Sequence, residues 1–123
     1  MTMVEREKRM GLHLPVEVRG EDAGGVRFTE YTRSVNISGG GVSFTSPREF
    51  KDGDRLALKI ILPPFTPIQT VIKIIRSSPN PQGQGFALAT EFIDLNADDQ
   101  ERLIRHILRT QAERLRARRS QVG

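Results

Sequence analysis

The segment "SVNISGGGVSF", residues 34–44, joins two stretches with the pattern of β-strands and contains three consecutive glycines. Asn36 and Ser38 stand two residues apart just before those glycines, and in an extended segment such side chains point to the same face. Glycine leaves the backbone open to close approach by another group. The residues alone therefore allow two interpretations: a hairpin turn or bulge, or a site that offers an amide, a hydroxyl and bare backbone to one ligand.

Strand patterns surround this segment on both sides. Apolar and polar residues alternate with a period of two, which predicts half-buried strands, and turn-forming stretches such as "GEDAGG" and "SPNPQGQG" separate them. Pro15 suggests that the first strand lies at a sheet edge. We expect an all-β domain, a small barrel or sandwich, over residues 12–95. Its six antiparallel strands would lie within residues 12–18, 26–38, 41–46, 54–62, 69–77 and 85–93.

The period changes after this region. Apolar residues then recur at helical spacing, Asn96 is a good N-cap, and two aspartates follow in the first turn, where they favour the helix dipole. We predict a helix over residues 96–118, roughly 33 Å long, and a disordered tail over 119–123. The apolar stripe is dense as far as Leu108 and thin beyond it. The first half of the helix should therefore pack on the body, and the second half should project or meet a partner.

Positive charge is concentrated at the C-terminal end. The 123 residues carry a net charge of +4, but residues 101–123 hold seven arginines against two glutamates, a local net charge of +5. Such a run suits electrostatic binding to nucleic acid or a solvated helix end. No aromatic residue interleaves with the arginines, so nucleic-acid binding is not expected.

Several classes of function are excluded by what the chain lacks. It has no cysteine and only two histidines, and no spacing of potential metal ligands, nucleophile elbow or P-loop occurs. His13 and His106 are interpreted as surface or boundary residues. No apolar run approaches the roughly 18 residues of a membrane span, and the charged N-terminus lacks the apolar region of a signal peptide. We expect a soluble, cytoplasmic, non-enzymatic protein without a metal or cofactor.

A short basic segment, "EREKR" at residues 5–9, precedes the first strand. Arginine is the preferred side chain for phosphate, and its planar guanidinium also stacks on bases. The alternative is a solvated, frayed terminus. In either case residues 1–11 are expected to form a flexible basic segment.

These features together resemble the PilZ domain. An arginine-rich segment leads into "LPVEV", then come Asn36-x-Ser38-x-x-Gly41 and a strand ending "GFALATEFIDL" before a helix. The resemblance covers about residues 5–110. It implies a six-stranded antiparallel PilZ-type β-barrel with a C-terminal α-helix, in a bacterial protein. Many members of this family bind the second messenger cyclic di-GMP through R-x-x-x-R and [D/N]-x-S-x-x-G motifs.

The resemblance also implies roles for particular residues. The arginines would pair with phosphates and stack on guanine, and the asparagine and serine would bond to the base edge and a phosphate. The glycines would let the backbone approach closely, and the N-terminal segment would fold over the ligand and thereby signal to an unidentified protein partner. The expected ligand-binding residues are Arg6, Arg9, Asn36, Ser38 and Gly41, with Lys8, Gly39 and Gly40 as additional candidates.

The first motif departs from the family pattern. Arg9 matches its second arginine, but Glu5 stands where the first belongs, so the chain has R-x-x-R from Arg6 to Arg9. A glutamate beside two phosphates costs about 1 kcal/mol in exposed surroundings. Two functions therefore stay open: a cyclic di-GMP receptor, or a degenerate PilZ adaptor that acts through protein contacts or self-association of its C-terminal helix.

Overall fold

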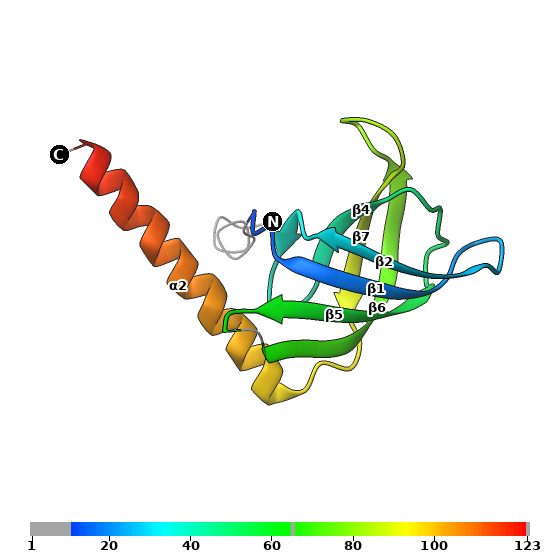
Figure 1. Cartoon of the computed structure of the whole chain (residues 1–123), viewed down its shortest axis with the longest axis horizontal. Helices are drawn as coiled ribbons and strands as arrows, with labels where there is room; N and C mark the ends of the chain where they lie inside the picture. The colour runs from blue at the N-terminus through cyan, green and yellow to red at the C-terminus, as the bar shows by residue number, and fades with distance from the viewer. Residues whose placement is uncertain (1–10, 65, 123) are drawn as a thin grey trace.

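The fold is a curled antiparallel sheet followed by one long helix (Figure 1). The computed structural model describes residues 11–64 and 66–122, with side chains as far as residue 119. Within these residues the sheet has the strand order β2-β1-β5-β6-β7-β4-β3. The strands are β1 (Pro15–Glu21), β2 (Arg27–Arg33), β3 (Asn36–Ile37), β4 (Val42–Ser46), β5 (Arg55–Leu62), β6 (Thr66–Pro79) and β7 (Phe86–Phe92), and the helix is α2 (Ala97–Val122).

The expected six-stranded barrel is wrong in strand number and closure, because the sheet is a seven-stranded half-barrel. The additional strand arises from residues 26–38, which form β2 and β3 rather than one strand. At the junction Ser34 N donates to Leu14 O at 2.9 Å, and the next amide, Val35 N, donates to Ser43 O at 2.8 Å. The chain therefore leaves the ladder with β1 and joins β4 within two residues.

The side chain of Ser34 holds this crossing in place. The residue is fully buried, and its Oγ accepts a hydrogen bond from Leu14 N at 2.9 Å and donates one to Leu12 O. A buried backbone group without a partner is costly, and this hydroxyl satisfies two such groups. Ser34 thus fastens the first described residues of the chain to the start of the glycine segment.

Pro15 does not mark a sheet edge, because β1 lies between β2 and β5. Pro15 is the first residue of β1 and pairs only with Arg33 of β2, while pairing with β5 begins at Val16. A proline at the first position of a strand removes no ladder hydrogen bond on the second side. The expectation of an edge strand was therefore wrong, because Pro15 precedes the first residue of β1 that pairs with β5.

Side chains bridge the two ends of the curled sheet. After β4, Arg48 Nε lies 2.7 Å from Glu30 Oε1 of β2, and its Nη1 lies 2.9 Å from Asp22 Oδ2. The Arg48 guanidinium also lies 4.7 Å from the centre of the Phe28 ring. A hydrogen bond from Val26 N, with further contributions from Gly24 N and Arg48, lowers the pKa of Asp22. This ionic cluster joins β2 to β4 where backbone pairing does not.

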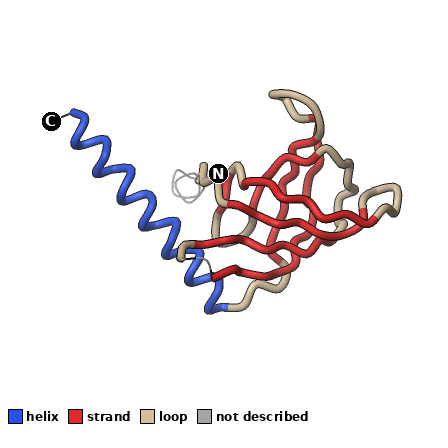
Figure 2. The backbone as a smooth tube through the Cα atoms, in the orientation of Figure 1, coloured by secondary structure: helices blue, strands red, loops and turns tan. Residues whose placement is uncertain are grey.

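The sheet is curled, and the first part of α2 lies beside it (Figures 1 and 2). Buried side chains from the strands and from the first part of α2 form one core. Strand β5 shows the expected alternation, with Leu56, Leu58, Ile60 and Leu62 buried. Leu103 and Ile107 of α2 are buried against the same core, whereas Leu108 is 58% exposed. The first half of the helix therefore packs on the body and the second half projects, as predicted.

The helix begins where the sequence predicts and ends later. Asn96 Oδ1 accepts a hydrogen bond from Asp99 N at 2.8 Å, which is the expected N-cap. The helix continues to Val122, so the prediction of an end at 118 and a disordered tail over 119–123 is wrong for residues 119–122. Within the described part of the chain, no helix is long and apolar enough to span a membrane.

Replacing Ser34 by alanine tests the crossing. Ser34→Ala leaves Leu14 N–H and Leu12 C=O without their buried partner, which should lower the free energy of unfolding by about 1–3 kcal/mol. Urea denaturation measures this change. Ser77→Ala is the matched control, because the buried Ser77 Oγ has no partner within the described residues and its loss should not destabilise the protein. Equal losses for the two variants would contradict this account of Ser34.

Candidate functional site

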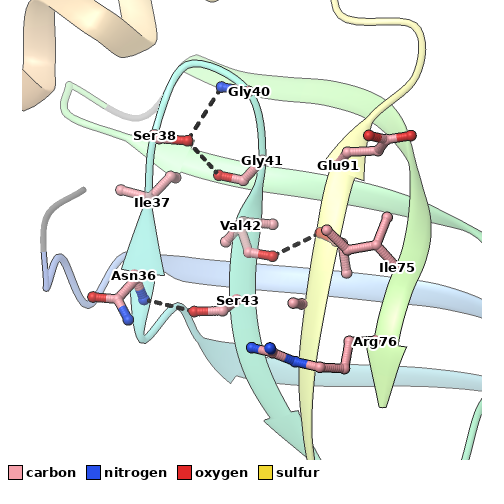
Figure 3. A pocket seen from close by; sticks show the side chains of 12 residues that line it. Asn36, Ile37, Ser38, Gly40, Gly41, Val42, Ser43, Ile75, Arg76 and Glu91 are labelled. Carbon is pink, nitrogen blue, oxygen red and sulfur yellow. Dashed lines mark hydrogen bonds between the residues drawn. The ribbon is translucent and has the colours of Figure 1, made fainter. Parts of the chain in front are cut away.

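The glycine segment forms a tight turn between β3 and β4 that Ser38 organises (Figure 3). Ser38 N donates to Gly41 O at 3.0 Å, and Gly40 N donates to Ser38 Oγ at 3.2 Å. The serine therefore binds the turn through its backbone and its hydroxyl. This is the local hydrogen bonding that favours serine in turns.

Gly41, and to a lesser extent Gly39, is required by close packing rather than by a left-handed backbone. A Cβ on Gly41 would lie 2.1 Å from Thr90 O of β7, and one on Gly39 would lie 3.1 Å from Ile104 Cδ1 of α2. At Gly40 the nearest atom to such a Cβ is Ser38 Oγ, 4.0 Å away. Positive φ angles are found instead at Gly25, Gly53 and Gly85. Gly41 thus lets β4 start directly against the β7 backbone.

Asn36 and Ser38 lie on either side of the buried Ile37. Asn36 is exposed and Ser38 is half-buried, so both side chains face away from the core, as their spacing predicts. Asn36 N donates to Ser43 Oγ at 3.1 Å, which pairs the two short strands. Within the described residues, the side-chain amide of Asn36 makes no hydrogen bond.

An open pocket of about 700 Å³ lies beside this turn (Figure 3). One wall comes from β3, the turn and β4, with Asn36, Ser38, Gly40 and Gly41 among its residues. The other wall comes from β6 and β7. Of the remaining expected residues, Gly39 contacts α2 instead, and Arg6, Lys8 and Arg9 lie outside the described residues, as does Glu5.

The second wall contains residues that the sequence analysis did not select, namely Ile75, Arg76 and Glu91. Glu91 Oε1 lies 3.2 Å from Lys73 Nζ, so a neighbouring cation offsets its charge. Ile75 and Arg76 lie at an irregularity in the pairing of β6 with β7. The consecutive isoleucines Ile74 and Ile75 interrupt the alternation of this strand. This interruption is the sequence feature that could have indicated the irregularity.

Helix α2 contacts both the turn and the beginning of the described chain. Gln100 Nε2 donates to Gly39 O at 3.0 Å. Further towards the C-terminal end of the helix, Arg114 Nη2 donates to Gly11 O at 3.0 Å. The helix thus touches the glycine turn and Gly11, which lies two residues after the basic stretch "EREKR".

The charge of the projecting half of α2 comes from its arginines. Partial burial and the nearby Arg109 lower the pKa of His106, with Glu113 acting in the opposite direction. The lowered pKa favours the neutral imidazole, so the charge of this surface comes chiefly from arginine. Among the described residues, no group of three or more histidine and carboxylate side chains could hold a metal ion.

The two neighbouring glycines allow a direct test of the turn. Gly41→Ala should push β4 away from Thr90 and lower the free energy of unfolding by about 1–3 kcal/mol, the usual cost of overpacking. Gly40→Ala is the matched control, because its Cβ meets no atom closer than 4.0 Å. Thermal unfolding followed by circular dichroism measures both. A loss for Gly40→Ala as large as that for Gly41→Ala would refute the packing explanation.

Comparison with solved structures supports the fold and shows that the matching proteins are longer than this chain. MotI/DgrA, an inhibitor of motility from Bacillus subtilis, matches with a TM-score of 0.71 and 25% identity over 85% of this chain and 49% of that chain. YcgR from Escherichia coli in complex with c-di-GMP gives 0.67 and 16% over 94% and 49%. The K. pneumonia MrkH–c-di-GMP complex gives 0.67 and 17% over 89% and 52%. The chain thus spans about half the length of these proteins.

No curated protein matches the chain significantly. The family model of the PilZ domain, in contrast, matches residues 4–109. This range includes the N-terminal basic segment, the whole sheet, the glycine turn and the first half of α2. With a half-barrel, a long C-terminal helix and the Asn36-x-Ser38-x-x-Gly41 turn, this chain belongs to the PilZ domain family.

Proposed function

We propose that this chain is a cytoplasmic cyclic di-GMP receptor without catalytic activity. The observation that carries the proposal is the Asn36-x-Ser38-x-x-Gly41 turn, which forms one wall of an open pocket of about 700 Å³. The PilZ family assignment supports it, as do the YcgR and MrkH structures, whose complexes contain c-di-GMP.

The two walls of the pocket suggest how the ligand is held. Asn36, with its exposed side chain, bonds to the base edge, and Ser38 bonds to a phosphate. The narrow backbone at Gly40 and Gly41 leaves room for a large ligand to approach. Two phosphates also need cations, which Arg6 and Arg9 supply from the N-terminal segment, with Lys8 as a further cation.

The position of Gly11 brings that segment within reach of the pocket. A Cβ on Gly11 would lie 3.9 Å from Asn36 Oδ1, so the described chain begins beside the turn. Arg9 is two residues away, a span of at most about 7 Å, and Arg6 is five residues away, at most about 17 Å. Both arginines can therefore reach phosphates bound next to Asn36.

Ligand binding would then alter the segment that α2 contacts. We infer that residues 6–9 become ordered over the ligand, and that this ordering is the signal that a protein partner detects. Arg114 holds Gly11 O at the base of this segment. The helix is accordingly placed to respond when the segment moves.

Glu5 weakens this site. It stands where the first arginine of the family motif belongs, and its carboxylate repels phosphate. Arg6 takes over that role in our proposal. The receptor should therefore bind cyclic di-GMP less tightly than a chain with a complete R-x-x-x-R motif.

A degenerate adaptor is the second candidate, and the projecting half of α2 favours it. Leu108 and Leu115 are 58% and 53% exposed there, which suits contact with a protein partner or a second copy. Truncation after Leu108 should then lower the oligomeric state in analytical ultracentrifugation or abolish partner binding. A truncated chain that keeps its oligomeric state and its partners would count against this role of the helix.

Calorimetric titration with cyclic di-GMP tests the receptor. We expect the wild type to bind and Ser38→Ala to bind about tenfold more weakly, because a hydrogen bond to a charged group is lost. Glu5→Arg should bind more tightly than the wild type, because it completes the R-x-x-x-R motif.

Two controls separate these effects from general ones. Glu7→Arg makes the same charge change as Glu5→Arg without completing the motif, and Thr29→Ala removes an exposed hydroxyl from β2, away from the pocket. Glu7→Arg should not tighten binding as Glu5→Arg does, and Thr29→Ala should not weaken binding as Ser38→Ala does. Absence of binding on the order of tens of micromolar ligand, for the wild type and Glu5→Arg alike, would rule the receptor out.

A further inference from the structure

Strand β6 contains a β-bulge at the wall of the pocket. Ile74 pairs with Thr90 of β7 and Arg76 pairs with the adjacent Ala89, so Ile75 is an extra residue without a partner in the ladder. A bulge of this kind bends the strand and redirects the side chains that follow it.

The bulge exchanges the two faces of the strand. Before it the even-numbered residues point inward, and Ile72 and Ile74 are fully buried. With a regular period of two, Arg76 would continue this buried row. After the bulge Ser77 is the inward residue, opposite the buried Leu88, and its buried Oγ lacks a partner within the described residues. The bulge therefore moves Arg76 from the core to the pocket.

Arg76 is exposed, and no hydrogen bond or ion pair holds its guanidinium within the described part of the chain. Figure 3 shows the guanidinium directed from β6 towards β4, the strand that contains Ser43. Glu91 in the same wall is paired with Lys73 instead. The five donors of Arg76 are therefore available to a ligand.

The surroundings of Arg76 match a purine base better than a phosphate. Ile75 is 48% exposed in the same wall and provides an apolar surface. The Glu91 carboxylate also lines this pocket. Lys73 offsets part of its charge, but its oxygens can accept hydrogen bonds from a base and offer none to a phosphate. Guanine presents O6 and N7 as two adjacent acceptors, which an arginine contacts with two parallel hydrogen bonds.

We propose that Arg76 is a specificity-determining residue that binds the O6/N7 edge of a guanine base beside Ile75. This inference rests on the proposed function and deepens it by assigning base recognition to the bulge, while the N-terminal arginines take the phosphates. Adenine has a donor at N6 where guanine has the O6 acceptor, so the same guanidinium disfavours adenine. Arg76 therefore selects cyclic di-GMP over cyclic di-AMP.

Calorimetric titration of Arg76→Ala and Arg76→Lys with cyclic di-GMP tests the assignment. We expect Arg76→Ala to weaken binding by about ten- to a hundredfold, the range for a bidentate base contact. Arg76→Lys should be nearly as weak, because an ammonium cannot form two parallel bonds. The preference for cyclic di-GMP over cyclic di-AMP should fall in both variants. Arg27→Ala, which removes the same charge from β2, should bind like the wild type.

The outcomes separate this inference from the proposed function. Absence of wild-type binding removes the receptor and the role of Arg76 together. Wild-type binding that Arg76→Ala leaves unchanged overturns the role of Arg76 alone. If Arg76→Lys binds like the wild type while Arg76→Ala does not, the residue contacts phosphate and the assignment to guanine is wrong. Unchanged melting temperatures show that the variants are folded.

Discussion

The contact between Gly41 and the β7 backbone is the constraint on which the site depends. With only hydrogen on its Cα, Gly41 lies so close to Thr90 O that a Cβ would come within 2.1 Å. The Thr90 hydroxyl donates to Val42 O at 2.7 Å, and Phe92 N donates to Gly40 O at 2.9 Å. These bonds hold the turn against β7, so that one wall of the pocket is set directly beside the other. The Ser38 hydrogen bonds then shape a loop whose ends are already fixed.

Two further contacts connect this turn to the parts of the chain that the proposed function requires. Ser34 binds the backbone at Leu12 and Leu14, next to Gly11, which lies beside Asn36. Helix α2 reaches the turn through Gln100 and reaches Gly11 through Arg114. Helix α2 thus contacts both the turn and Gly11, although these parts are far apart in sequence.

Local patterns predicted most of the fold. Alternation located β5 to within a residue, and the Asn96 cap located the start of α2, because each of these signals depends on interactions within a few residues. The errors occur where distant segments decide. The alternation in residues 26–38 predicts one strand. In the structure two consecutive amides bind different neighbours, because Ser34 N donates to Leu14 O and Val35 N donates to Ser43 O. Pro15 predicts an edge strand, but β1 is an inner strand whose pairing with β5 begins one position later, at Val16. The helix extends to Val122 although its apolar stripe becomes thin after Leu108.

The sequence by itself determined the family motif at Asn36, Ser38 and Gly41, its departure at Glu5, and the all-β domain with its C-terminal helix. It could do so because motif spacing, alternation and capping are local properties of the chain. Only the tertiary structure decided that Gly41 is required for contact with Thr90, and that Arg76 faces the pocket. Both facts depend on the register between β7 and its neighbours. A single extra residue in β6 reverses which side chains face outward, and that register follows from pairing across the whole sheet.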